Sequence, residues 1–174
     1  MKLKYMFVLS LIASSSSFAQ DCVENQPLSQ EAGQFIDRKD GTILDVSTNL
    51  LWQKCNVGET YNTDSNTCSG SPTSAINWTS ALTNENVGVD GFRLPNIKEL
   101  GSIVNYQCAK PAIDLAFFPS TINVPYWTST PDAQGLNSGY SGLIIDFTEG
   151  QEVTANSSGI MLLRLVKDFN QTTN

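Results

Sequence analysis

The sequence contains no histidine among its 174 residues. A Ser-His-Asp triad, a Cys-His pair and a His-ligated zinc site each need an imidazole, so the chain can hold none of them. Lysine and arginine are also scarce, at 10 against 17 aspartates and glutamates, which gives a net charge of −7. A nucleic-acid binder needs a basic face to release counterions. We therefore expect no histidine-based hydrolase and no nucleic-acid partner.

Long hydrophobic runs are missing as well. The run from Tyr5 through Ala13 is far shorter than the roughly 20 residues that span a bilayer, and no later stretch comes close, so we expect no transmembrane segment. Two lysines precede this run, and it leads into Ser17-Phe18-Ala19. This order is typical of a secretory signal peptide cleaved after Ala19. We expect residues 1–19 to be a signal peptide and the protein to be exported, to the periplasm or the cell exterior.

The cysteines are few, at four, but in an exported chain they indicate two disulfides. Three connectivities are open, and we favour Cys55 with Cys68 and Cys22 with Cys108. The first pair closes a short polar loop, worth about 3 kcal/mol, and the second a long loop, worth about 4.5 kcal/mol. Zinc is the alternative, but no C-x-x-C spacing occurs and no histidine can complete a mixed site.

Short alternating segments at 34–37, 42–46 and 50–53 predict a three-stranded meander. Asp40-Gly41 is typical of its first turn, and Asn49 tolerates a left-handed backbone in the second. Residues 56–72, rich in glycine, asparagine and proline, predict a loop.

Two helices are expected next. Apolar residues at three-and-four spacing predict the first over 74–85, capped by Thr73 or Ser74. The second begins after Pro95, with Asn96 as N-cap and Glu99 as the acid of a capping box. Strands are expected at 124–129, 143–147 and 160–166. This order indicates an α+β domain with a largely antiparallel sheet, and no glycine-rich turn supports a dinucleotide fold.

Several motifs then occur together along the chain. They are Phe35-Ile36-Asp37, Asp40-Gly41-Thr42, Leu50 to Cys55, Arg93 to Leu100, Pro111-Ala112-Ile113, Phe118-Pro119, Tyr126 to Thr130 and Arg164-Leu165-Val166. With this order the chain resembles the Lcl C-terminal domain family, named for the end domain of a bacterial collagen-like adhesin. The resemblance covers a domain at 33–167, which leaves an N-terminal segment at 20–32. The tail at 168–174 is polar, and we expect it to be disordered.

The resemblance implies a C-type-lectin-like fold, in which the first and last strands lie together, two helices flank the sheet and long loops carry the ligand. It also implies extracellular adhesion or glycan binding, since the founding adhesin recognises sulfated polysaccharides. The charge balance differs from that ligand, because lysines and arginines scattered singly form no basic patch for a polyanion.

Ligand candidates are polar residues in the late loops from Pro131 to Gly142 and from Glu149 to Gly159, because loops on a rigid scaffold often carry binding residues. Simple solvation of these loops is the alternative. The candidates are Asp132, Gln134, Asn137, Tyr140, Glu149, Gln151 and Asn156.

Other notable residues are expected to be structural. Arg93 and Glu99 flank the start of the second helix and predict an ion pair. Trp52, Trp78 and Trp127 stand among apolar neighbours, so we expect them in the core, with sugar stacking as the alternative.

Three aspartates around the first turn, Asp37, Asp40 and Asp45, are weak calcium candidates, because their spacing does not follow the EF-hand pattern. No other cofactor is expected.

The leading hypothesis is a non-enzymatic binding module that recognises a glycan or a surface protein. A second hypothesis is an enzyme related in fold to the formylglycine-generating enzymes, which would need free reactive cysteines. A third is a structural subunit of an envelope or appendage complex. The ligand and the oligomeric state are left open.

Overall fold

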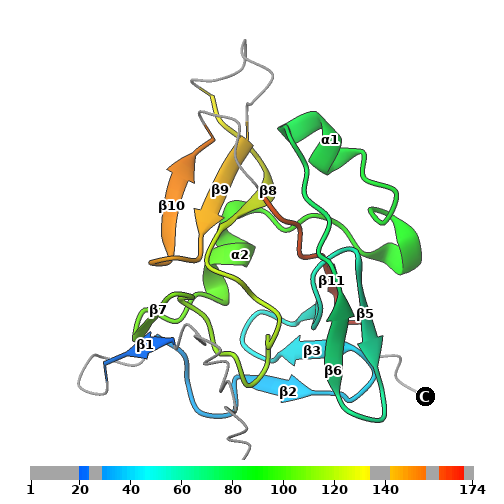
Figure 1. The fold of residues 1–174 in the computed structure, drawn as a ribbon, viewed down its shortest axis with the longest axis vertical. Helices are drawn as coiled ribbons and strands as arrows, with labels where there is room; N and C mark the ends of the chain where they lie inside the picture. The colour runs from blue at the N-terminus through cyan, green and yellow to red at the C-terminus, as the bar shows by residue number, and fades with distance from the viewer. Residues whose placement is uncertain (1–19, 24–28, 134–141, 156–160, 171–174) are drawn as a thin grey trace, which may run out of the picture.

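The computed structural model describes residues 20–23, 29–133, 142–155 and 161–170, arranged as in Figure 1. Within these residues the strands form four antiparallel sheets, which agrees with the predicted antiparallel pairing, and the helices are few and short. The elements in chain order are β1 (Asp21–Cys22), β2 (Phe35–Asp37), β3 (Thr42–Asp45), β4 (Leu50–Gln53), β5 (Glu59–Asn62), β6 (Thr67–Gly70), α1 (Trp78–Leu82), the 3-10 turn η1 (Val89–Gly91), α2 (Ile97–Ser102), β7 (Cys108–Ala109), β8 (Pro125–Pro131), β9 (Gly142–Asp146), β10 (Gln151–Thr154) and β11 (Val166–Asp168).

The largest sheet has the order β11-β4-β3-β2, so the end of the domain joins the predicted meander. Trp52 of β4 lies between Ile43 and Val166, and all three side chains are buried. The turn residues adopt the expected backbone, because Gly41 has φ 85° and Asn49 has φ 56°. Since side chains alternate across a strand, the opposite face of this sheet points away from the core.

A second sheet has the order β10-β9-β8, and its paired strands β8 and β9 have hydrophobic core on both faces. Tyr126 and Ile145 pack into one hydrophobic cluster with Trp52, whereas Trp127 and Ile144 pack into another. Neighbouring residues serve different clusters because they point to opposite faces. At Gly142 a Cβ atom would collide with the Trp78 indole, so glycine is required there.

The segment 161–166 crosses between these two sheets, and the predicted strand over 160–166 is therefore largely wrong. Leu162 bonds to β8 through Trp127, whereas Leu165 already accepts from Gln53 of β4. Only Val166 belongs to a regular strand. The apolar residues of this segment do alternate, but successive residues pack into two different hydrophobic clusters rather than along one strand.

The predicted loop at 56–72 is wrong, because it contains the β5–β6 hairpin. Most of the hairpin's side chains are exposed or half-buried, so no apolar alternation marked it.

The first helix begins later than predicted. Asn77, not Thr73 or Ser74, caps α1 by accepting from Ser80 N at 2.8 Å. Ser74 instead forms an isolated bridge with Leu162. The second helix is confirmed, with Asn96 and Glu99 completing the capping box of α2.

Both predicted disulfides are present. Cys22–Cys108 joins β1 to β7, and Cys55–Cys68 joins the end of β4 to the hairpin. Regular structure also extends past residue 167, since Asp168 belongs to β11 and Phe169 N donates to Asn49 O at 3.0 Å.

Candidate binding cleft

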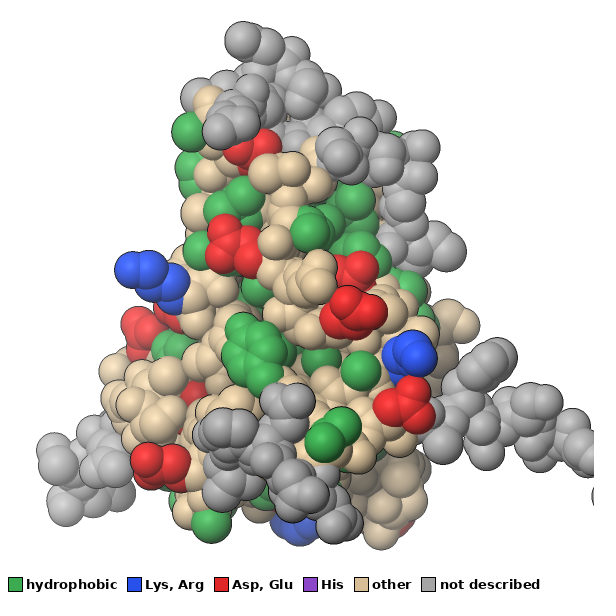
Figure 2. Space-filling view, turned by 90° about the vertical axis from the view of Figure 1, so that its left-hand side faces the viewer, with side chains coloured by type: hydrophobic (Ala, Val, Ile, Leu, Met, Phe, Trp, Pro, Cys, Tyr) green, Lys and Arg blue, Asp and Glu red, His purple; other side chains and the backbone are tan. Residues whose placement is uncertain are grey.

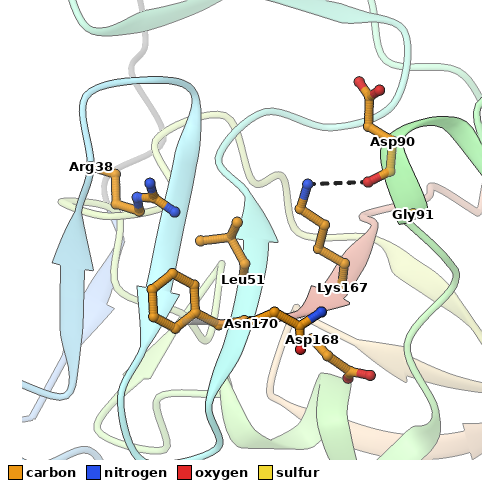
Figure 3. A pocket seen from close by; sticks show the side chains of 8 residues that line it. Arg38, Leu51, Asp90, Gly91, Lys167, Asp168 and Asn170 are labelled. Carbon is orange, nitrogen blue, oxygen red and sulfur yellow. Dashed lines mark hydrogen bonds between the residues drawn. The ribbon is translucent and has the colours of Figure 1, made fainter. Parts of the chain in front are cut away.

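An open cleft of about 700 Å³ lies on the outer face of the four-stranded sheet, beside the end of β11 (Figure 3). Three distant parts of the chain enclose it: the β2–β3 turn, η1 and the residues that follow Val166. Its lining residues are Arg38, Leu51, Asp90, Gly91, Lys167, Asp168, Phe169 and Asn170.

The bottom of the cleft is part of an apolar row across the sheet. The strand register places Ile36 opposite Leu44, Leu44 opposite Leu51, and Leu51 opposite Lys167. Ile36 is 49% exposed, whereas Leu51 is only 5% exposed. The row is therefore exposed at Ile36, buried at Leu51 and followed by the cation Lys167.

Two basic side chains stand on opposite sides of Leu51 in Figure 3. The Arg38 guanidinium lies 5.5 Å from the centre of the Phe169 ring and 3.6 Å from the Asp40 carboxylate. Lys167 Nζ donates to the Asp90 carbonyl oxygen at 3.1 Å and lies 4.4 Å from the centre of the Phe92 ring. Aromatic faces attract such cations and hold them in place.

The Arg93–Glu99 ion pair supports one wall of the cleft. The guanidinium donates to both Glu99 oxygens, at 2.8 and 2.9 Å, and to Asp168 Oδ1 at 3.2 Å. The hydrogen bonds to Glu99 raise the pKa of Arg93. Burial raises the pKa of Glu99, but bonds from Arg93 and from Asn96 N outweigh it and lower that pKa overall. The pair fixes Asp168 beside the start of α2.

Arg164 fills the junction where the chain crosses between the sheets. It is fully buried and donates to Gln53 O, Lys54 O, Asn56 Oδ1 and Thr121 Oγ1 at 2.6–2.9 Å. Burial lowers its pKa. Neutral oxygens thus bind a buried cation at the centre of the scaffold.

A second polar cluster lies beneath the β5–β6 hairpin. Lys54 is 1% exposed, and its Nζ donates to Asp37 Oδ2 and to Asn66 Oδ1, both at 2.7 Å. Tyr61 OH donates to the same Asn66 oxygen at 2.7 Å. Burial raises the pKa of Asp37, but bonds from Lys54, Lys39 and Asn66 hold it well below its usual range.

The structure does not bring together the described members of the predicted ligand set. Gln134, Asn137, Tyr140 and Asn156 lie outside the described residues. Asp132 follows the end of β8 that pairs with the start of β9, whereas Glu149 lies in the β9–β10 turn and Gln151 begins β10, at the other end of that sheet. Residues 151–154 are also strand β10 rather than loop.

Two of the three tryptophans lie in the core, as predicted, and the third is half-buried. Trp52 and Trp127 are fully buried, and Trp127 Nε1 donates to Ala75 O at 3.0 Å. Trp78 is half-buried and donates to Thr128 O at 2.9 Å. The two buried rings have no face open to a ligand.

The three calcium candidates point to separate partners. Asp37 binds Lys54, Asp40 accepts from Thr42 N, and the buried Asp45 accepts from Ser47 N. Among the described residues, no group of three or more acidic or cysteine side chains could hold a metal ion.

All four cysteines are in disulfides, so none is a free thiol. Within the described ranges, no helix is long and apolar enough to cross a membrane.

The cleft was not predicted, because its residues come from positions about 38, 90 and 167 and no local motif joins them. Each meander strand has one apolar residue on the outer face: Ile36, Leu44 and Leu51. This row could have indicated the bottom of the cleft, had the pairing of β11 with β4 been known. Figure 2 shows a different face of the molecule, on which the basic side chains stand apart from one another.

The sequence profile of the Lcl C-terminal domain family matches residues 41–167, which include half of the residues that line the cleft and all of α2. No curated protein and no solved structure matched the chain. The profile covers well over half of the sequence and the motifs noted above from residue 41 onward. The chain therefore belongs to the Lcl C-terminal domain family.

Proposed function

We propose that this protein is an exported, non-enzymatic binding module with a C-type-lectin-like scaffold, and that it recognises a glycan or a surface protein in the cleft beside β11. Membership of an adhesin-associated family supports this proposal. Two disulfides are also typical of proteins that work outside the reducing cytosol.

The composition of the cleft is the observation that carries the proposal. The half-buried Phe169 offers apolar surface, Arg38 and Lys167 offer donors, and Asp168 offers acceptors, while the buried Leu51 forms the bottom of the cleft. A sugar ring has an apolar face and a rim of hydroxyl groups, so it fits a site with both kinds of contact. Three of its residues, Leu51, Lys167 and Asp168, lie on strands, which hold such groups more precisely than loops do.

The enzyme alternative has less support. Its thiol chemistry would require one of the two disulfides to open, since no cysteine is free. We propose that binding needs neither a metal nor another cofactor, because the donors and acceptors of the cleft are side chains of the chain itself.

A glycan array, combined with capture from a cell-surface extract, tests the proposal. We expect the disulfide-bonded protein to bind a defined group of glycans or one surface protein, in the presence of a chelator as well as without it. Absence of binding in both assays would contradict the proposal. Binding that disappears with the chelator would contradict its cofactor-free part.

A further inference from the structure

The cluster beneath the β5–β6 hairpin has a chemical feature that binding does not use. A buried amine, a side-chain amide and a carboxylate meet there. Asp37 Oδ2 accepts both from Lys54 Nζ at 2.7 Å and from Asn66 Nδ2 at 2.9 Å. The lysine amine therefore lies against the amide group, with one carboxylate oxygen bonded to both nitrogens.

The amide carbonyl is polarised from a second direction. Tyr61 OH and Lys54 Nζ both donate to Asn66 Oδ1 at 2.7 Å. The Tyr61 ring packs against Gly41, where a Cβ atom would come within 3.0 Å of the ring, so the ring closes the cluster on this side. A donor aimed at a carbonyl oxygen stabilises the negative charge that develops when a nucleophile attacks the carbon.

We propose that Lys54 and Asn66 join in an intramolecular isopeptide bond, with Asp37 as the catalytic residue that transfers protons. A desolvated lysine is a competent nucleophile once it loses its proton, and the carboxylate that would accept the proton is in contact with it. The reacting groups are held together before reaction, which removes most of the entropic barrier.

The step balances without any other reagent. Lys54 gives a proton to Asp37, and its lone pair forms a bond to the Asn66 side-chain carbon. Asp37 then protonates the amide nitrogen, the carbon–nitrogen bond to that nitrogen breaks, and ammonia leaves. The new amide returns its extra proton to Asp37, which passes it to ammonia. One lysine cation is thus replaced by one ammonium ion in solution.

Lys39 sets the rate of this reaction. Its Nζ also donates to Asp37 Oδ2, at 2.9 Å, and helps to hold the carboxylate in its charged form. The charged ion pair of Lys54 and Asp37 must first become a neutral amine and acid, so we expect slow formation of a single bond. Each pKa unit that Asp37 regained would raise the population of the neutral pair about tenfold.

The bond would duplicate a link that the protein already has, but with different chemistry. Cys55–Cys68 joins the same two segments of chain, at the residue after Lys54 and two residues after Asn66. An amide resists reduction, whereas a disulfide does not. The hairpin would therefore stay attached to β4 under reducing conditions.

Mass spectrometry of the purified, fully reduced protein tests the proposal. We expect the wild type to be lighter than its sequence by one ammonia molecule. Trypsin cannot cut after a lysine whose amine is in an amide, so the digest should contain one uncleaved peptide, residues 40–93, closed into a loop between Lys54 and Asn66. An N-terminal Gln20 can also lose ammonia by cyclising. If the loss maps to Gln20 alone, or if folded protein keeps its full mass, the proposal is overturned.

Matched variants separate the chemistry from folding. Lys54→Arg and Asp37→Asn should keep the full mass, and their two intact disulfides would show that they have folded. Lys98→Arg, at an exposed lysine on α2, should form the bond as the wild type does. Lys39→Ala should form it faster, counted from the moment of folding. Formation of the looped 40–93 peptide in Asp37→Asn at the wild-type rate would contradict the role of Asp37.

Discussion

At the scale of single residues, the main departure from an apolar core is Arg164. A fully buried arginine usually has a carboxylate partner, but this guanidinium is bound to backbone carbonyls and to neutral side chains. The Phe118 ring lies 5.1 Å from it and adds a favourable contact. Because its acceptors come from β4 and from the segment before β8, the residue ties together parts of the chain that are distant in sequence.

Replacing Arg164 with leucine should lower the free energy of unfolding by about 3 kcal/mol, because it leaves several buried oxygens without donors. Urea denaturation with the disulfides intact measures this change. Arg38→Leu, at an exposed arginine, should change stability by less than about 0.5 kcal/mol. A loss of similar size in both variants would contradict the role given to Arg164.

Glu99 should make stability depend on pH on the acid side. Its pKa is lowered in the folded protein, so its contribution is complete above the ordinary value of 4.5 and is lost as the pH falls through the lower folded value. Thermal melting against pH measures this loss. Glu99→Gln should reduce the slope of stability against pH in that acid range, and an unchanged slope would contradict the assignment.

At the scale of elements, the meander strands, the start of α2 and both disulfides were predictable, whereas the start of α1 and the β5–β6 hairpin were not. Asn96 and Glu99 are three residues apart and satisfy each other's backbone groups, so a local pattern was enough. The β5–β6 hairpin was missed although its disulfide was predicted, because its side chains are exposed or half-buried and its contacts, such as Lys54 with Asn66, are polar. The segment around Leu162 changes strand partners within four residues, which no periodicity predicts.

The cap of α2 should be worth about 1 kcal/mol. Asn96 Oδ1 accepts from both Lys98 N and Glu99 N at 2.9 Å, so Asn96→Ala removes two bonds at once. Chemical denaturation should show a loss of about this size. Asn123→Ala, at an exposed residue outside the helices, should leave stability within about 0.5 kcal/mol of the wild type. An equal effect of the two substitutions would contradict the capping role.

At the scale of the whole molecule, hydrogen bonds between distant segments fix the walls of the cleft before any ligand arrives. Arg93 and Val166 exchange two backbone hydrogen bonds, at 2.8 and 2.9 Å, and thereby hold the chain after η1 against β11. Asn49 accepts from Phe169 N and donates through its side chain to Phe169 O, both at 3.0 Å. A site held in this way loses little conformational entropy on binding.

The glycan array, read with matched variants, tests the central claim that the cleft binds the ligand. The double variant Arg38→Glu/Lys167→Glu reverses both cations of the cleft, whereas Lys98→Glu/Lys110→Glu makes the same change of net charge at exposed lysines outside its lining. We predict that the cleft variant loses at least about tenfold in affinity, or 1.4 kcal/mol, and that the control binds as the wild type does. Equal binding by all three proteins would contradict the claim.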